Sequence, residues 1–350
     1  MRKQISKAIY LLFAIMVIAS ISFSSCKKDK ATPVVTTALA DSITKATALL
    51  NNSVEGVAAG QYQRGSKAAL QTTITEVQAI LDDPTSTQTD INNAIANLSA
   101  AVALFKTKAI VPIAQANLIA QWTFSEGTGN TVTDASSNHL VGTFMEGHSV
   151  IVGRGPLPTW CPDRYGVANQ ALHFSYGGHI EVPYSSILAP TQISISMWFQ
   201  VDSLNLADNY MISEDWWNGY KLNLQTATKP FFTFNNGSTI FDRDWNANGI
   251  TDHSWHHLVV TLTEGNESYY GDGALIYTWT NVTGGISILN PQAFVIGQAQ
   301  PNTLVDVLPA DDPSQWGVGY FRGSMDEIRI YNIALTATQV TSIYNEEKPE

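Results

Sequence analysis

Hydrophobic residues between positions 36 and 110 recur at the three-to-four-residue spacing of helices. Three stripes occur, separated first by Gly56 and Gly60 and then by the turn sequence DDPTSTQ. The stripes are Leu39, Ile43, Ala46 and Leu50; Leu70, Ile74, Val77 and Leu81; and Ile91, Ile95, Leu98, Val102 and Phe105. Thr87 with Asp90 three residues later is typical of a helix start. Because each helix has one apolar face, the pattern predicts a small three-helix bundle.

The helical spacing ends near Leu118, and short runs of alternating or continuous apolar residues follow. Turn-forming residues separate runs such as LIAQWTF, HIEVPY, ISISMWFQV, WHHLVVTLT and MDEIRIYN. Many short strands at regular spacing predict an all-β sandwich or jelly roll. In ISISMWFQV, Ile193 and Met197 share one face and Trp198 lies on the other, so we expect this strand to be covered on both sides.

The first 26 residues have the pattern of an export signal. Arg2, Lys3 and Lys7 precede the apolar run AIYLLFAIMVIASI, which has the length of a signal-peptide core. Small residues then precede Cys26 in ISFSSC, which resembles a bacterial lipobox. An ordinary signal peptide that happens to contain a cysteine is the alternative. We therefore predict a lipoprotein signal peptide over 1–25.

Lipidation of Cys26 would anchor the chain to the membrane through acyl chains alone. The polar segment 26–35 then acts as the tether. The SSCKKD sequence around the cysteine resembles lipoproteins of Bacteroidetes-type bacteria. We expect an outer-membrane protein held at the cell surface, with the periplasmic face as the alternative.

The charge balance narrows the choice of partners. The formal net charge is −11, and cleavage of the signal peptide would remove three basic residues. Phosphate binding needs a basic face, so this balance argues against nucleic acid. It is compatible with neutral glycans and with calcium. Because lipidation uses Cys26, Cys161 is left alone and we expect no intrachain disulfide in the mature protein.

The helical sequence GQYQRGSKAALQTTITEVQAILDDPTSTQTDINNAIANLSAAVALF resembles the FIVAR modules of bacterial surface proteins. The resemblance implies a spacer or an interaction unit. The segment carries no histidine, no cysteine and no clustered acids beyond a turn. We interpret residues 36–110 as a spacer that holds the next domain away from the membrane.

Several phrases of the second region resemble, in order, the laminin-G-like family within the concanavalin A-like lectin/glucanase superfamily. They are LIAQWTFSEGTGNTVTDASSN, ALHFSYGGHIEVP, ISISMWFQVD, SWHHLVVTLT, YYGDGALI and FRGSMDEIRIYNIALTATQV. The resemblance covers 117–345 and implies a mainly β fold, with two antiparallel sheets in a jelly-roll sandwich. It does not imply one function, because members bind glycans or proteins and enzymes use the fold as an accessory domain.

The catalytic motif of the familiar glucanases on this fold is absent. Those enzymes present Glu-x-Asp-x-x-Glu on one strand, and no glutamate here is followed two residues later by aspartate. Glu214 and Asp215 are adjacent, so on a strand they would face opposite ways. We interpret Cys161 and the pair His256–His257 as structural residues. The chain is therefore expected not to be an enzyme.

Asp134, Asn138 and Asp326 are the candidate ligands of a structural calcium ion. If the last strand is regular, Asp326 shares the core face with Ile328, and a buried carboxylate needs a cation or several donors. Asp134 and Asn138 belong to the acidic turn TDASSN, and calcium takes six to eight oxygen ligands. Glu126 could add a further ligand. A hydrogen-bonded turn against the last strand is the competing interpretation.

Tryptophans in turn-like contexts point to carbohydrate binding. Trp216 and Trp217 lie in SEDWWNGY, and Trp245 lies in RDWNAN, each beside polar or acidic residues. Loops carry function on such scaffolds, and sugars pack their C–H surfaces on flat aromatic rings. We therefore select Trp216, Trp217, Tyr220 and Trp245 as ligand-binding candidates. Packing of the rings against sheet edges is the alternative for each.

These patterns together predict a lipid-anchored surface protein that captures polysaccharide without cleaving it. Other surface proteins of polysaccharide uptake would be its neighbours. A protein-binding adhesin or a structural surface protein is the first alternative, and a glycoside hydrolase with unfamiliar acids is the second.

Overall fold

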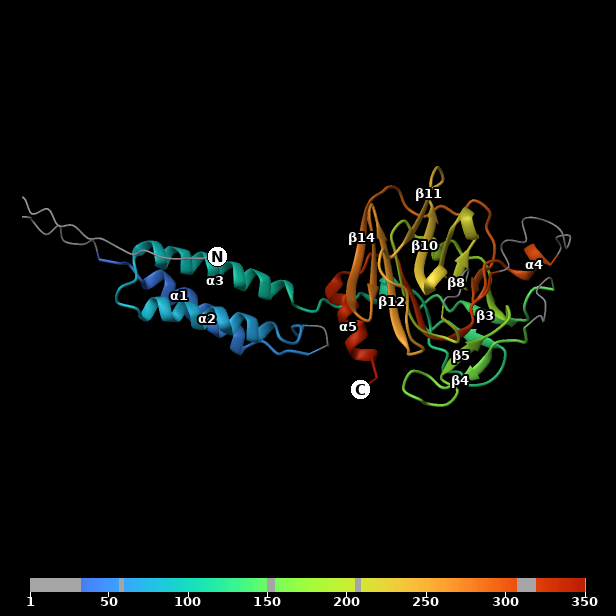
Figure 1. Cartoon of the computed structure of the whole chain (residues 1–350), viewed down its shortest axis with the longest axis horizontal. Coiled ribbons are helices and arrows are strands. Elements are labelled where there is room, and N and C mark those ends of the chain that lie inside the picture. Colours follow the sequence, from blue (N-terminus) through green and yellow to red (C-terminus); the bar gives the residue numbers. More distant parts are fainter. Residues whose placement is uncertain (1–32, 57–59, 150–154, 205–208, 307–318, 350) are drawn as a thin grey trace, which may run out of the picture.

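A computed structural model describes residues 33–56, 60–149, 155–204, 209–306 and 319–349. The predicted signal peptide, Cys26 and most of the tether lie outside the described residues. A helical unit occupies one end of the molecule and a β-sandwich the other (Figure 1). Within the described ranges, no helix combines the length and the apolar character needed to cross a membrane.

Three helices form the first unit: α1 (Thr37–Asn51), α2 (Ser66–Asp82) and α3 (Gln88–Thr107). Their apolar stripes pack into one core, so the predicted bundle is confirmed. Thr87 caps α3, because its side chain accepts from the backbone N–H of Asp90 while the Asp90 carboxylate accepts from Thr87. Tyr62 closes the bundle by stacking on Phe105, with ring centroids 4.3 Å apart.

The second unit contains two eight-stranded antiparallel sheets within the described residues. Sheet I has the order β14 (Ala274–Val282), β13 (Gly265–Gly271), β12 (His256–Thr263), β7 (Ile193–Val201), β16 (Gly323–Tyr331), β5 (Ala171–Phe174) and β4 (Thr159–Cys161), and β1 (Leu118–Trp122) also pairs with β16. Sheet II has the order β11 (Ile240–Asp244), β10 (Lys229–Asn235), β9 (Tyr220–Gln225), β8 (Asn209–Glu214), β15 (Phe294–Ile296), β6 (His179–Val182), β3 (Val141–Met145) and β2 (Thr131–Thr133).

The remaining helices precede, connect or follow the strands. They are η1 (Gln115–Asn117), η2 (Ser186–Leu188), η3 (Trp216–Asn218), η4 (Thr226–Thr228), α4 (Asn302–Val305) and α5 (Ala337–Glu347). This architecture confirms the predicted mainly β, jelly-roll-like sandwich with a helical unit at its N-terminal side.

The core lies between the two sheets, where every second residue of each strand points inward. On β7, Ile193, Ile195 and Met197 belong to this core, whereas Trp198 points outward and stacks on Tyr344 of α5. A separate apolar cluster lies between α5 and the outer face of sheet I. The expectation that the β7 strand is covered on both sides is therefore confirmed.

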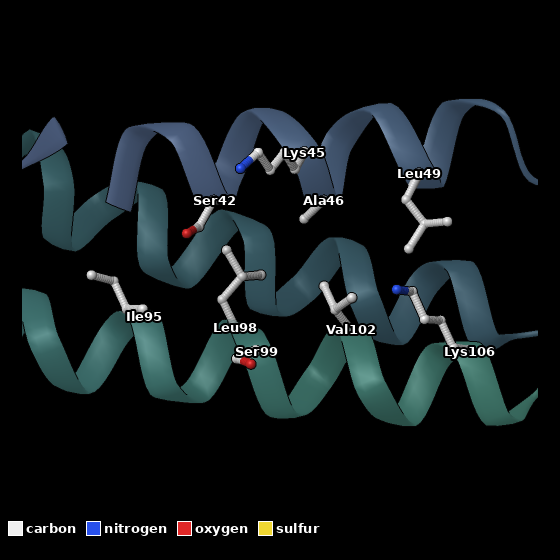
Figure 2. Close-up of a pocket in the computed structure, with 9 residues that line it drawn as sticks. All are labelled: Ser42, Lys45, Ala46, Leu49, Ile95, Leu98, Ser99, Val102 and Lys106. Atoms are coloured by element: carbon white, nitrogen blue, oxygen red, sulfur yellow. The ribbon is translucent and has the colours of Figure 1, made fainter. Parts of the chain in front are cut away.

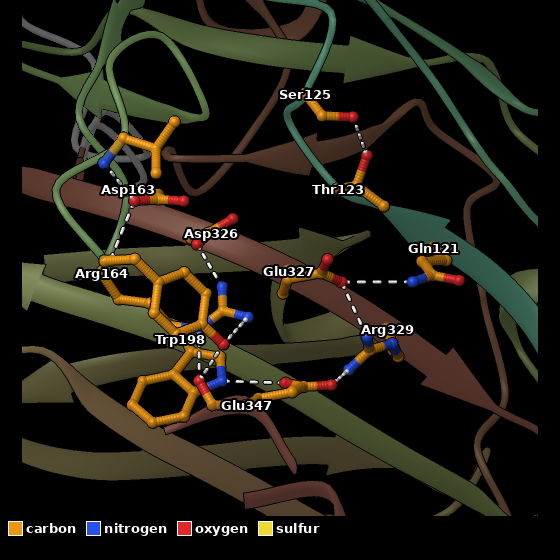
Figure 3. A network of polar contacts seen from close by, with 12 residues as sticks. Gln121, Thr123, Ser125, Asp163, Arg164, Trp198, Asp326, Glu327, Arg329 and Glu347 are labelled. Atoms are coloured by element: carbon orange, nitrogen blue, oxygen red, sulfur yellow. Dashed lines mark hydrogen bonds and ion pairs between the residues drawn. The ribbon is translucent and has the colours of Figure 1, made fainter. Parts of the chain in front are cut away.

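The end of α5 is fixed to sheet I by a polar network (Figure 3). Trp198 donates from its indole Nε1 to a Glu347 carboxylate oxygen at 2.9 Å, and Arg329 forms an ion pair with the same carboxylate. Arg329 also contacts Glu327 at 2.8 Å, and Arg164 Nε donates to the Glu347 backbone carbonyl at 2.8 Å. These contacts hold the last helix across the outer face of sheet I. The outer face of sheet II is on the opposite side of the sandwich.

The linker between the two units runs beside the same helix. Gln339 of α5 donates from its side-chain amide to the Val111 carbonyl at 3.4 Å, and Asn332 N donates to the Asn117 carbonyl at 3.0 Å. The chain then enters sheet I at Leu118, the first residue of β1. The N-terminal connection and the C-terminal helix therefore meet at one side of the sandwich.

Candidate functional site

The strand alternation of sheet II places a row of polar and aromatic side chains on its outer face. On β9, Tyr220, Leu222 and Leu224 belong to the core, so Lys221 and Asn223 point outward. Cross-strand pairing then aligns outward residues in two rows. One row is Asp242, Thr233, Lys221 and Ser213, and the other is Asp244, Phe231, Asn223 and Tyr210.

Trp216 and Trp217 add two rings at the edge of these rows. We define the outer cluster as Tyr210, Trp216, Trp217, Lys221, Asn223, Phe231, Thr233 and Asp242. Of the tryptophans and tyrosine selected from the sequence, Trp216 and Trp217 belong to it.

Lys221 lies at the centre of the outer cluster with none of its surface exposed. Its Nζ is 4.5 Å from the centroid of the Trp217 ring, 5.3 Å from that of Phe231 and 5.5 Å from that of Tyr210. Nζ also donates to Asn223 Oδ1 at 3.2 Å and lies 4.0 Å from a carboxylate oxygen of Asp242. A desolvated ammonium is stabilised by aromatic faces and by anionic or amide oxygens, and both are present here.

The Lys221 ammonium therefore contacts three of the rings at once and fixes their positions relative to one another. Asp242 is fixed in turn, because it accepts a hydrogen bond from the Thr233 hydroxyl. A set of rings and polar groups that hold one another in place is preorganised for a ligand.

The loop that carries the two tryptophans has an unusual backbone. Asp215 and Trp216 have φ values of 58° and 51°, in the left-handed region that non-glycine residues rarely adopt. Trp216 is held there by hydrogen bonds from its N–H to Ser213 Oγ and from its Nε1 to the Tyr210 hydroxyl, both at 3.2 Å. The two indoles meet edge to face, with centroids 5.9 Å apart, and both are half-buried.

Further contacts anchor the loop at its other end. The side-chain amide of Asn235 donates to the Trp217 carbonyl at 3.2 Å, and Asn290 N donates to the Asp215 carboxylate at 2.6 Å. The rings are therefore set in position rather than left on a free loop.

Glu214 belongs to the other side of the same strand. It pairs with the core residue Tyr220 and is fully buried, and within the described chain neither of its carboxylate oxygens has a hydrogen-bond partner. Burial, reinforced by the neighbouring Asp215 carboxylate, raises the pKa of Glu214 to about 8. Glu214 is therefore protonated at neutral pH and faces the core instead of the outer cluster.

A second polar group lies farther along the outer face of sheet II. Glu181 Oε1 accepts from Asn302 N at 2.7 Å and lies 3.1 Å from His179 Nε2, and His148 contacts the Gln298 side chain at 2.6 Å. Burial and the nearby His179 lower the pKa of His148 to about 4. At neutral pH His148 is therefore uncharged.

Two of the selected aromatic residues need correction. Tyr220 is fully buried in the core and donates its hydroxyl to the Leu188 carbonyl at 2.8 Å. Trp245 also packs into the core, beside Gly271, where the missing side chain leaves room for the indole. Neither ring is available to a ligand, because both point between the sheets.

The residues selected for calcium do not fit a shared site. The Asp134 carboxylate accepts from Gln121 N and Ser136 N at 2.7 Å each, from the Ser136 hydroxyl at 2.6 Å and from Leu140 N at 3.2 Å. Asn138 donates from its side chain to the Ile119 carbonyl at 3.0 Å. These contacts correspond to the competing interpretation of a hydrogen-bonded turn.

Asp326 does not share the core face with Ile328, and the reason is a β-bulge. The register of β16 shifts between Asp326 and Arg329, and Glu327 has φ of 52°. Asp326 therefore pairs with the outward-facing Trp198 and forms an ion pair with Arg164. Within the described ranges, no group of three or more His, Cys, Asp or Glu side chains could hold a metal ion.

Several residues of the outer cluster were not selected from the sequence. Lys221, Asn223 and Thr233 alternate with core residues in YKLNLQ and PFFTFN, and this alternation is the signal that could have found them. Phe231 and Tyr210 lack such a signal, because aromatic residues in a strand are usually taken for core.

Comparison with family models supports the domain content. Residues 174–341 match the model of the concanavalin A-like lectin/glucanases superfamily, and residues 35–104 match that of the FIVAR domain. The two matches lie in the same order along the chain as the helical unit and the sandwich. No curated protein is significantly similar to the chain.

Solved structures that match part of the chain include an arabinanase domain and two toxin structures. Domain 4 of AbnA, a GH43 extracellular arabinanase from Geobacillus stearothermophilus, in complex with arabinotriose, is 21% identical, with 65% of this chain and 98% of that chain covered and a TM-score of 0.48. A structure of botulinum neurotoxin type C, whose cell entry depends on two ganglioside molecules, is 14% identical, with 66% and 51% covered and a TM-score of 0.46. The binding domain of Paraclostridial Mosquitocidal Protein 1 is also 14% identical, with 66% and 52% covered and a TM-score of 0.45. The match spans about half the length of these two toxin structures.

Proposed function

We propose that the outer face of sheet II binds glycan without cleaving it, and that the chain is a lipid-anchored protein of the bacterial surface. The outer cluster carries this proposal. Half-buried rings of Trp216, Trp217 and Phe231 lie beside the Asp242 carboxylate, whose side chain is 37% exposed, and Asn223 is buried beneath them. Sugars need both elements, because aromatic faces pack on their C–H surfaces while a carboxylate accepts hydrogen bonds from their hydroxyls.

The positions of the carboxyl groups favour binding over hydrolysis. A glycosidase needs two carboxyl groups that flank one bond, one of them a proton donor. On β11, Asp242 and Asp244 face outward, but each is engaged by a lysine, Asp242 with Lys221 and Asp244 with Lys229 at 3.1 Å. The strongly perturbed carboxyl of Glu214 faces the core. We therefore assign the outer cluster to recognition.

The remaining features are consistent with a surface protein that captures polysaccharide. The signal-like N-terminus with Cys26 supports a lipid anchor, and the helical module supports a spacer between that anchor and the sandwich. Proteins of polysaccharide uptake would be the natural neighbours of such a protein. In this arrangement the anchor and the spacer would present the sandwich to polysaccharide outside the cell.

Affinity electrophoresis and isothermal titration against a panel of soluble polysaccharides test the proposal. With a polysaccharide that binds the purified chain, Trp217→Ala should weaken binding about tenfold, because it removes a large ring surface. Phe231→Ala should act in the same direction. Tyr184→Ala is the matched control, since Tyr184 is 42% exposed and lies outside the outer cluster.

Unchanged affinity in folded Trp217→Ala and Phe231→Ala proteins would remove the outer cluster from the proposal. Release of reducing ends from any polysaccharide by the purified chain would overturn its non-catalytic part. Folding of each variant is checked by near-UV circular dichroism, which reports the tryptophan environment.

A further inference from the structure

The helical module has an open groove that its own core does not fill. Figure 2 shows it between α1 and α3, with α2 behind. The groove has a volume of about 380 Å³. Its floor is formed by Ala46, Leu98 and Val102, and Leu49 and Ile95 lie along its sides.

The groove has the shape that a helix requires. Along α3, Ile95, Leu98 and Val102 follow the i, i+3, i+7 spacing of a helix-facing stripe, and Leu49 on α1 faces them. The α3 residues of the lining extend from 95 to 106, which corresponds to about 16 Å or three helical turns. Small side chains at Ser42 and Ser99 allow a second backbone to approach closely.

The charges at the groove have one sign. Lys45 on α1 and Lys106 on α3 are its two ionisable lining residues, and both are exposed. In the part of the chain that the structure describes, neither lysine forms an ion pair, and this includes Lys45 with Asp41 one helical turn earlier. Two cations at an apolar groove are notable in a chain whose net charge is −11. They complement an occupant that carries acidic residues beside an apolar stripe.

We propose that the groove between α1 and α3 is a docking site for an acidic amphipathic helix of a partner protein. Such a helix would pack its aliphatic stripe against Leu49, Ile95 and Val102 and complete the module as a fourth helix. Its glutamates or aspartates would reach Lys45 on one wall and Lys106 on the other. The module would then be an attachment point in addition to a spacer, independently of whether the sandwich binds glycan.

Two synthetic helical peptides of about 18 residues are the probes, because shorter helices are marginal in water. Both carry the same leucine stripe, and one has glutamate where the other has lysine on its flanks. Fluorescence anisotropy with the full purified chain should show at least tenfold tighter binding of the acidic peptide. The double variant Lys45→Glu/Lys106→Glu should reverse that preference, whereas Arg64→Glu, an exposed charge outside the groove, should leave it unchanged.

A third variant tests the groove by shape instead of charge. Ser99 is exposed and lines the groove, so Ser99→Trp should fill it and abolish peptide binding while the module stays folded by far-UV circular dichroism. Equal binding of the two peptides, or full binding by Ser99→Trp, would overturn the proposal. A concentration-dependent dimer in sedimentation equilibrium that Ser99→Trp abolishes would also overturn it, by showing that a second copy occupies the groove.

Discussion

Replacing Glu214 by glutamine should stabilise the sandwich at neutral pH and leave its stability in acid nearly unchanged. Glu214 is fully buried at the core side of β8, and in the described chain both of its carboxylate oxygens lack hydrogen-bond partners. Folding therefore raises the pKa of its carboxyl from 4.5 to about 8. Glutamine keeps the shape of the neutral acid and cannot ionise, so the variant removes the titration alone.

The size of the effect follows from the two pKa values. Between pH 4.5 and about 8 the unfolded chain has lost this proton while the folded chain keeps it, so the free energy of unfolding falls as pH rises. Each pH unit in this range costs 1.36 kcal/mol, which gives about 3 kcal/mol at pH 7. Below pH 4.5 both states are protonated and the penalty disappears.

Urea unfolding followed by tryptophan fluorescence at several pH values measures the difference between the two proteins. The expected result is a gap near zero in acid that widens to about 3 kcal/mol in favour of Glu214→Gln at pH 7. Glu267, whose pKa burial also raises to about 8, contributes the same slope to both proteins and cancels in the comparison. A gap that does not change with pH, or a less stable variant at pH 7, would refute the reasoning.

Three further substitutions test the packing of the two units. Arg329→Met should cost about 2 kcal/mol and lower the melting temperature, because it leaves the partly buried Glu347 carboxylate without its cation; an unchanged melting temperature would contradict this. Gly273→Ala should destabilise the sandwich by more than 1 kcal/mol in urea, since φ is 76° and the added methyl would lie 2.7 Å from the Tyr344 ring; stabilisation would show that α5 moves freely. Thr87→Ala should cost about 1 kcal/mol through loss of the α3 cap, and helical circular dichroism on heating would show no shift if the cap were dispensable.

The helices and the sandwich were predictable because their signals are local. Leu39, Ile43 and Leu50 recur at helical spacing and all three are buried, and Thr87 caps α3 as its sequence context indicates. The same holds for β7, where the alternation of apolar residues matches the two covered faces. Periodicity fixes which residues share a face, and burial of an apolar face follows directly from it.

The site was predictable only in part, because it depends on which face of a strand meets the other sheet. Tyr220 begins the alternating strand YKLNLQ, whose leucines mark the core face, so the tyrosine belongs inside and Lys221 outside. Trp245 belongs to the core between the sheets and lies beside Gly271, a distant residue that no local pattern connects to it. The predicted position of Asp326 was wrong because β16 has a bulge at Glu327. Glycine is the usual residue at a positive φ, and the sequence has none there.

The meeting of linker and last helix at one side of the sandwich has a mechanical consequence. A pull transmitted through the helical module first meets the Val111 contact to α5 and then, from Leu118 onward, the hydrogen bonds between β1 and β16. Those bonds belong to sheet I, whereas the rings around Lys221 belong to sheet II. Tension on the tether would therefore load sheet I, while the aromatic rings on sheet II kept their spacing.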